Sequence, residues 1–299
     1  MVVPVYNGGP VLEQLVAALR AALELSPYDY EVILVDDGSE DDTWPKIATL
    51  ARAGGGIRGL RLARNYGQHN ALLAGIRAAD RELTVTIDAD LQYPSDRIPE
   101  LIAKLDEGWD VVYGTAGRRT EGYARRVASW LARRLLRRAM RAPVSFSSFR
   151  AFRTDLRDGF ANFGGPYVSI DVLLSWSTVR YASIPVEQAS RTIGRSSYSP
   201  RKLASLALTM LTGFTTLPLR LASLVGFAFT LVGFGLLAFV IVDFLIVGRQ
   251  VPGFAFLASI IAIFAGAQLF ALGIIGEYLG RVHMRVLDPP TYAVREELP

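Results

Sequence analysis

The feature that most constrains this chain is an almost wholly apolar stretch from Leu217 to Ile275. Two parts of it, 221–247 and 254–275, are each long enough to cross a hydrocarbon core of about 30 Å, which takes roughly 20 helical residues. The link between them, 248–253, is very short, so we expect two transmembrane helices in a hairpin. A pair of buried core helices is the alternative, but no other segment of the chain could cover two helices this apolar.

Basic residues lie on both sides of the predicted hairpin, whereas the link holds only Arg249. The positive-inside rule then puts both ends of the hairpin in the cytosol. We therefore predict a multi-pass protein of the inner (plasma) membrane, with an interfacial segment at 201–220 and a cytosolic tail at 276–299. The flanking basic residues are Arg201, Lys202, Arg220, Arg281, His283 and Arg285.

Residues 1–200 have the composition of a charged globular domain, and strand signals alternate with helix signals along them. This order predicts βαβ units and therefore an α/β domain with a mainly parallel sheet that is covered on both faces. The chain has no cysteine, which excludes disulfides and cysteine-based zinc sites. The expected strands are 1–5, 31–35, 59–63, 83–87 and 110–113, and the expected helices are 11–25, 43–52, 70–79 and 99–107.

Acidic side chains follow the predicted strands of this domain. In parallel sheets ligands bind outside the carboxyl ends of the strands, so these side chains should share one rim. Asp88 and Asp90 follow the strand 83–87, and a turn there lets both carboxylates approach one divalent cation. Such a cation could bridge a diphosphate and offset the charge on a leaving nucleotide. The other rim residues are Asn7, Asp36 and Asp37.

A strongly basic segment lies at 124–142, with seven arginines and no acid. At helical spacing most of the arginines share one broad side and the leucines the other, which predicts a basic amphipathic helix suited to anionic headgroups. A solvated charged face is the alternative, but uncompensated arginines would repel one another. Nucleic acid would also explain the arginines, but it would not explain the hairpin, so we expect no nucleic-acid partner.

Four motifs occur in a fixed order: Val3-Pro4-Val5-Tyr6-Asn7, Val35-Asp36-Asp37-Gly38-Ser39, Arg64-Asn65-Tyr66-Gly67-Gln68-His69 and Asp88-Ala89-Asp90-Leu91-Gln92. Together they resemble family 2 glycosyltransferases of the GT-A fold. The hairpin that ends in Gly276-Glu277-Tyr278-Leu279-Gly280-Arg281 narrows the resemblance to bacterial undecaprenyl-phosphate glycosyltransferases of the aminoarabinose and glucose type, and more distantly to dolichol-phosphate mannose synthases.

The resemblance implies a nucleotide-sugar donor site. Arg64 would lie near the diphosphate, Asp88 and Asp90 would bind Mg²⁺ or Mn²⁺, and Gln92 would lie close to the sugar. A loop from Arg191 to Tyr198 is similar to the family loop that closes over the diphosphate, with Arg191 and Ser196 at matching positions and Ser197 where lysine is usual. The residues implied to hold the nucleoside are Pro4, Tyr6, Asn7, Asp36 and Asp37.

The resemblance also implies an acceptor site, in which Arg118 or Arg119, together with Arg126 and Ser129, holds the phosphate of a polyprenyl lipid. Relatives carry an aspartate just before the segment that begins at Ser147, and this chain has none there. A phosphate monoester with a second pKa of about 6 is already largely ionised at neutral pH, so it can attack without a base.

The expected reaction is metal-dependent, inverting transfer of one sugar from a nucleotide-sugar, UDP-linked as the first guess, to undecaprenyl or another polyprenyl phosphate. A processive polysaccharide synthase and a catalytically inactive membrane scaffold are the alternatives. The resemblance further implies a homo-oligomer, with a tetramer possible.

Overall fold

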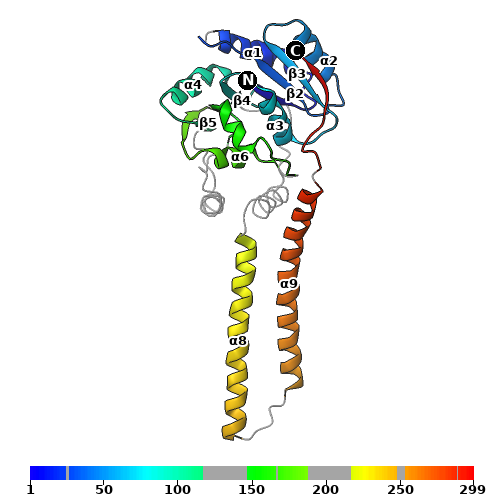
Figure 1. Cartoon of the computed structure of the whole chain (residues 1–299), viewed down its shortest axis with the longest axis vertical. Coiled ribbons are helices and arrows are strands. Elements are labelled where there is room, and N and C mark those ends of the chain that lie inside the picture. The colour runs from blue at the N-terminus through cyan, green and yellow to red at the C-terminus, as the bar shows by residue number, and fades with distance from the viewer. Residues whose placement is uncertain (25–26, 117–146, 166–167, 188–216, 248–252, 288) are drawn as a thin grey trace. The chain divides into compact units, whose positions relative to one another are not determined.

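The computed structural model describes residues 1–24, 27–116, 147–165, 168–187, 217–247, 253–287 and 289–299 (Figure 1). The chain divides into two compact units, one drawn from Met1–Ser197 and Asp288–Pro299 and the other from Tyr198–Leu287. The first unit holds the sheet and the second holds two long helices. The predicted architecture, an α/β domain with a mainly parallel sheet followed by two apolar helices, is confirmed.

The first unit is built on an eight-stranded sheet with the strand order β7-β5-β6-β4-β1-β2-β3-β8. Only β6 and β8 run antiparallel to their neighbours, so the sheet is mainly parallel. The strands are β1 (Val2–Val5), β2 (Val32–Asp36), β3 (Ile57–Leu62), β4 (Leu83–Thr86), β5 (Val111–Ala116), β6 (Arg150–Arg153), β7 (Tyr181–Val186) and β8 (Val294–Leu298).

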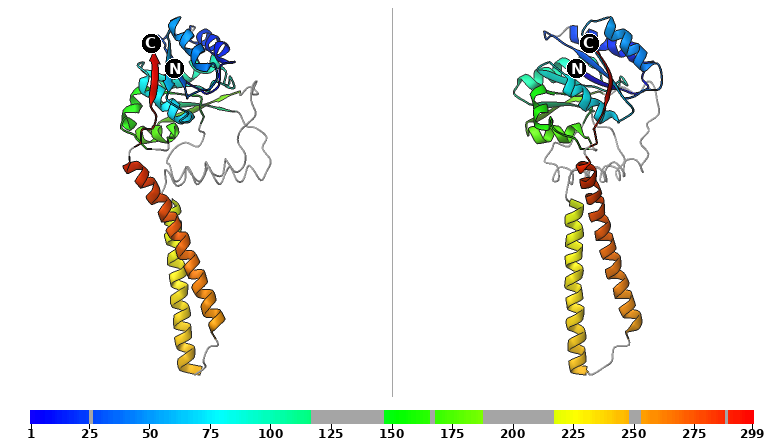
Figure 2. Two further views of the ribbon diagram at one scale, coloured as in Figure 1. Left: turned by 90° about the vertical axis from the view of Figure 1, so that its right-hand side faces the viewer. Right: turned by 45° about the vertical axis from the view of Figure 1, so that its right-hand side comes forward.

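Helices cover both faces of the sheet, as Figure 2 shows from two further sides. One core cluster joins α1 (Leu12–Glu24), α2 (Thr43–Arg52) and α4 (Ile98–Asp106) to the sheet. The other joins α3 (Gln68–Ala78), α6 (Ile170–Ser177) and the 3₁₀ helix η2 (Thr154–Phe160). The strands are apolar on both faces because successive side chains enter opposite clusters, which explains the continuous apolar runs in the sequence. A short 3₁₀ helix, η1 (Ser95–Arg97), leads into α4.

Strand β8 was not predicted from the sequence, because residues 276–299 were expected to form a cytosolic tail. Its residues Val294–Leu298 pair antiparallel with β3 at the edge of the sheet (Figure 1). Glu296 accepts a hydrogen bond from Trp44 Nε1, and Glu297 forms an ion pair with Arg58 at 3.0 Å. The strand has no apolar pattern, since all of its residues except the last are exposed.

The order of the strands locates a crevice. The chain passes from β1 to β2 and β3 on one side, whereas β4 pairs with the other side of β1. In parallel sheets such a change of direction opens a crevice at the carboxyl ends of the strands, and ligands bind there. The segments that follow β1, β2, β3 and β4 therefore reach the same rim.

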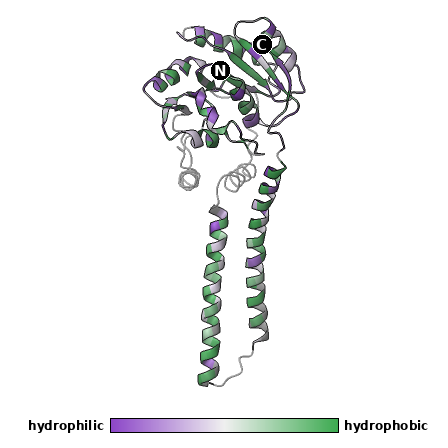
Figure 3. Ribbon diagram, in the orientation of Figure 1, coloured by the Kyte–Doolittle hydropathy of each residue, from purple (hydrophilic) through white to green (hydrophobic). Residues whose placement is uncertain are grey.

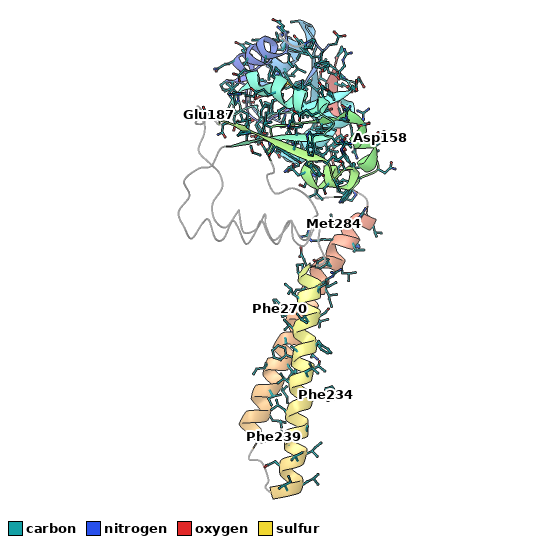
Figure 4. All side chains as sticks on the ribbon, turned by 90° about the vertical axis from the view of Figure 1, so that its left-hand side faces the viewer. Asp158, Glu187, Phe234, Phe239, Phe270 and Met284 are labelled. Atoms are coloured by element: carbon teal, nitrogen blue, oxygen red, sulfur yellow. The ribbon has the colours of Figure 1, made fainter. Side chains whose placement is uncertain are left out.

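The second unit is a pair of helices, α8 (Leu217–Val247) and α9 (Phe254–Val286), that contact each other, for example where the rings of Phe229 and Phe264 meet with centres 5.7 Å apart. Helix α8 begins at Leu217, before the predicted start at 221, and α9 continues to Val286, beyond the predicted end at 275. Two windows, Pro218–Asp243 and Ile263–Val286, are long and apolar enough to cross a membrane, and none of either window is buried. The helices are therefore not core helices of a globular domain. Figure 3 shows their apolar character, and Figure 4 shows exposed side chains such as Phe234 and Phe270 projecting from them.

Candidate active site

The first part of the rim follows β1 and β2, whose carboxyl ends lie side by side. Pro4 is buried within β1, while Tyr6 and Asn7 are exposed just beyond it. Asn7 has φ +48° and is tied to the turn after β2: its N–H donates to Ser39 Oγ at 2.9 Å, and its side-chain oxygen accepts from the Glu40 N–H at 3.0 Å. These bonds fix Tyr6 and Asn7 beside Asp36 and Asp37.

Asp36 and Asp37 are both buried, but they are used differently. Asp36 Oδ1 accepts the Ser39 N–H at 3.0 Å, whereas Asp36 Oδ2 makes no hydrogen bond to any residue that the structure describes, with Arg61 Nε 3.5 Å away. Both oxygens of Asp37 accept backbone N–H groups, from Tyr66 at 2.8 Å and Gly67 at 2.9 Å. Burial raises the pKa of Asp37. Asp37 therefore holds the loop after β3, whereas Asp36 Oδ2 is buried and has an ion pair with Arg61 but no hydrogen bond within the described part of the chain.

Gly38 lets these two loops meet. Its φ is +68°, and an added Cβ would lie 2.4 Å from the carbonyl carbon of Arg64 and 2.6 Å from the backbone nitrogen of Asn65. Only glycine fits so close an approach at this backbone angle. Arg64 is exposed, with its guanidinium 4.5 Å from the centre of the Tyr66 ring. The predicted diphosphate contact therefore lies at the rim, next to the loop that Asp37 holds.

Asp88 lies where the antiparallel pairing of β4 and β6 would continue. Thr86 pairs with Arg150 in this antiparallel ladder. Asp88, two residues after Thr86, therefore faces Ser148, two residues before Arg150. Ser148 Oγ donates to Asp88 Oδ2 at 2.5 Å, and Gln68 Nε2 donates to Asp88 Oδ1 at 2.5 Å. Both carboxylate oxygens are thus held by neutral side-chain donors.

Asp90 and Gln92 belong to the same turn. Asp90 Oδ1 accepts the Gln92 N–H at 3.2 Å, and both side chains are half-buried. Leu91 between them has φ +56°, a backbone angle that costs energy for a branched side chain and that clusters at functional sites. Tyr93 stacks on Phe149 with ring centres 5.3 Å apart and hydrogen-bonds Ser147 Oγ at 3.0 Å. Burial raises the pKa of Tyr93, and the charges of Asp88 and Asp90 add to this effect.

A buried charged pair lies behind this turn. Arg150 is 1 % exposed and forms an ion pair with Asp171 at the start of α6. Arg150 Nε also donates to Thr86 Oγ1 at 3.2 Å, and the Tyr113 hydroxyl donates to Asp171 Oδ1 at 3.0 Å. Burial, together with the Asp171 charge, raises the pKa of Tyr113 well above its ordinary value. Neither Arg150 nor Asp171 was predicted as a site residue.

The carboxylates suit a metal ion shared with a substrate. Among the described residues no group of three or more His, Cys, Asp or Glu side chains could hold a metal ion. Mg²⁺ and Mn²⁺ often bind through one or two carboxylates together with substrate phosphates, and Asp88 and Asp90 provide such a pair. The two residues therefore fit a cation that binds together with a diphosphate.

Several predicted site residues lie outside the described part of the chain. They are the acceptor residues Arg118, Arg119, Arg126 and Ser129, the basic segment 124–142, and the loop residues Arg191 and Ser196. The structure does bring together Tyr6, Asn7, Asp36, Asp37 and Arg64 around the first two loops. Gln68 and Ser148 were not predicted as site residues, although Gln68 lies in the third of the four motifs and Ser148 in the segment that begins at Ser147.

The family model of glycosyl transferase family 2 matches residues 1–160, which is more than half of the chain. An undecaprenyl-phosphate 4-deoxy-4-formamido-L-arabinose transferase from Enterobacter sp. (strain 638) is 37% identical over 99% of this chain and 92% of its own length. The transferase of the same name from Klebsiella pneumoniae subsp. pneumoniae is 36% identical with the same coverage.

Solved structures that resemble this one include glucosyl-3-phosphoglycerate synthase from Mycobacterium tuberculosis in complex with Mn²⁺ and UDP-glucose. It is 20% identical with a TM-score of 0.48, and the match covers 71% of this chain and 75% of that chain. Mannosyl-3-phosphoglycerate synthase from Rubrobacter xylanophilus is 19% identical with a TM-score of 0.48, covering 70% of each chain. The family model and the relatives that match nearly full length show that this chain belongs to glycosyl transferase family 2.

Proposed function

We propose that this glycosyltransferase moves a single sugar from a nucleotide-sugar to undecaprenyl phosphate or another polyprenyl phosphate at a membrane surface. The observation that carries this proposal is the combination of the acidic rim with two long exposed apolar helices in one chain. Relatives named as undecaprenyl-phosphate sugar transferases, which align over 99% of the chain, support the same acceptor.

The connectivity of the chain supports a catalytic domain on one side of the membrane. The unit that holds the sheet is drawn from both sides of the helix pair in the sequence, Met1–Ser197 and Asp288–Pro299. Two crossings return the chain to the side on which it started, so β8 can rejoin the sheet. The basic residues at the two ends of the hairpin favour the cytosolic side, where nucleotide-sugars are available, and the plasma membrane as the location.

In the proposed donor site, Pro4, Tyr6 and Asn7 line the nucleoside, and Asp36 Oδ2 accepts a hydrogen bond from it. Arg64 lies beside the diphosphate, and Gln92 lies near the sugar. Asp88 and Asp90 hold Mg²⁺ or Mn²⁺, which supplies positive charge to the leaving diphosphate when bound. Asp37 serves the donor site indirectly, because its carboxylate already holds the loop that carries Arg64. UDP is our first choice of nucleotide.

In the proposed acceptor site, Arg118 or Arg119, Arg126 and Ser129 hold the lipid phosphate, and Arg191 and Ser196 belong to the loop that covers the diphosphate. A phosphate oxygen attacks the anomeric carbon, a new carbon–oxygen bond forms, and the bond to the nucleoside diphosphate breaks. Attack opposite the leaving group inverts the anomeric carbon. The phosphate is already ionised, so the chain's residues contribute alignment and charge stabilisation and no base is needed.

The test is a donor screen with the full-length protein in detergent, undecaprenyl phosphate, Mn²⁺ and a panel of UDP-, GDP- and dTDP-sugars, including UDP-4-deoxy-4-formamido-L-arabinose. Mass spectrometry of the lipid product should find exactly one added sugar from one class of nucleotide. A polymer would support a processive synthase instead. No transfer from any donor, with no metal-dependent nucleotide binding, would support an inactive scaffold and contradict the proposal.

A further inference from the structure

The Asp88 carboxylate is held at both oxygens by side chains from distant parts of the chain. Gln68 lies at the start of α3, and Ser148 lies two residues before β6. We propose that Gln68 and Ser148 are positioning residues that fix the orientation of Asp88, and that the buried Arg150–Asp171 pair anchors both of them. This inference rests on the proposed function, in which Asp88 acts on a cation and a diphosphate.

The two donors suit a carboxylate that must keep its charge. Gln68 and Ser148 are neutral, so they orient Asp88 without cancelling its attraction for a cation. An ionised carboxylate offers about four acceptor positions, so a carboxylate that accepts hydrogen bonds at both oxygens can also ligate a metal ion. A carboxylate held at both oxygens also loses little further rotational freedom when a ligand binds. Groups that hold a ligating carboxylate in this way typically change metal affinity 10- to 100-fold when removed.

The position of Ser148 is set by the sheet. Ser148 faces Asp88 because Thr86 pairs with Arg150 in the β4–β6 ladder. Thr86 Oγ1 also donates to the Ser148 carbonyl oxygen at 2.6 Å, which fixes the Ser148 backbone. The Ser148 hydroxyl therefore meets Asp88 without any rearrangement, provided that Arg150 keeps its place in β6.

Gln68 is linked to the same buried pair. The residue after it, His69, accepts the Ile170 N–H at Nδ1 with a distance of 3.4 Å, and Asp171 follows Ile170 at the start of α6. Asp171 pairs with Arg150, whose Nε donates to the same Thr86 hydroxyl that donates to the Ser148 carbonyl. The Arg150–Asp171 ion pair therefore connects two segments. Arg150 follows Ser148 at the start of β6, and Asp171 lies in α6, whose first residue contacts His69 beside Gln68.

The experiment compares Ser148→Ala, Ser148→Thr and Gln68→Leu in the full-length protein in detergent. Binding of UDP in the presence of Mn²⁺ is measured by calorimetry, so the readout does not depend on turnover. Ser177→Ala is the matched control, because it removes a hydroxyl that donates to the Leu156 carbonyl at 2.8 Å within the α6–η2 region and does not contact Asp88. Thermal unfolding of each variant reports whether the fold is intact.

We expect Ser148→Ala and Gln68→Leu each to weaken Mn²⁺-dependent UDP binding by about 10-fold or more. Ser148→Thr keeps the hydroxyl and should bind within about threefold of wild type, and Ser177→Ala should bind as wild type does. Gln68 is exposed, so its replacement should leave folding intact even where Ser148→Ala does not. If Gln68→Leu and folded Ser148→Ala both bind UDP with wild-type affinity in Mn²⁺, this inference is wrong, but the proposed function still stands. Absence of Mn²⁺-dependent UDP binding in the wild type would overturn the proposed function as well.

Discussion

The two acidic turns of the rim, 36–39 after β2 and 88–92 after β4, each contain an aspartate whose two oxygens accept hydrogen bonds, but the donors differ. In each turn one aspartate has both oxygens held by the chain. Asp37 receives two backbone N–H groups from the loop after β3, whereas Asp88 receives the side chains of Gln68 and Ser148. In the first turn we assign the neighbouring acid, Asp36, to the nucleoside, whereas in the second turn we assign both Asp88 and Asp90 to the cation.

This difference separates a turn fixed by the main chain from a turn fixed by side chains. Backbone donors at Asp37 are set by the path of the loop and by the glycine that allows its approach. Side-chain donors at Asp88 depend on a buried ion pair and can be changed one residue at a time. The first turn should therefore respond to mutation mainly through stability, and the second mainly through metal and donor binding.

The largest expected effect is on the ion pair beneath the second turn. Arg150→Met leaves the buried Asp171 carboxylate without its cation and should lower the free energy of unfolding by about 3–5 kcal/mol. The double variant Arg150→Met/Asp171→Leu should recover most of this loss, because it buries no unpaired charge. The measurement is the urea midpoint of the full-length protein. Equal stability of the single and double variants would contradict the assigned pairing.

The next largest effect is on turnover. Asp90→Asn keeps the size of the side chain and removes its charge, so it should lower the rate of sugar transfer by roughly 10²–10³-fold. Thermal unfolding should be unchanged, because Asp90 is half-buried at the rim. A rate near that of the wild type would contradict the assignment of Asp90 to the cation.

A smaller effect is expected at the first turn. Asp37→Asn replaces one acceptor oxygen by an NH₂ group that faces a backbone N–H, so it should cost about 1–3 kcal/mol of stability. The urea midpoint measures this cost. In the fraction that remains folded, UDP affinity should fall less than in Asp90→Asn. A large loss of UDP affinity without loss of stability would place Asp37 in direct contact with the nucleoside.

The smallest effect concerns pH. Burial lowers the pKa of His69, and its Nδ1 must stay unprotonated to accept the Ile170 N–H. The unfolded chain therefore takes up this proton at a higher pH than the folded chain does, and His69 contributes stability above about pH 6.5 that is lost as the pH falls. His69→Gln keeps an acceptor without this titration. Its melting temperature should fall less than that of the wild type between pH 7.5 and 5.5, and parallel curves would contradict the role of His69.

The sequence predicted the parallel strands, the helices between them and the acidic rim, because these depend on local patterns of apolar residues and turns. It did not predict β8, whose charged residues fit only an edge strand beside β3. It also missed Ser148 as a partner of Asp88, because that contact follows from the antiparallel register of β4 and β6. Asp171 gave no signal either, since a single acid before an apolar run is typical of a helix start.

The central claim is that the second turn and a divalent cation together hold the donor diphosphate. Calorimetric titration of UDP into the wild-type protein, with Mn²⁺ and then with EDTA, tests it most directly. The account predicts at least about tenfold tighter binding with Mn²⁺, a difference of about 1.4 kcal/mol, and loss of that difference in Asp90→Asn. Equal affinity for UDP with Mn²⁺ and with EDTA would contradict it.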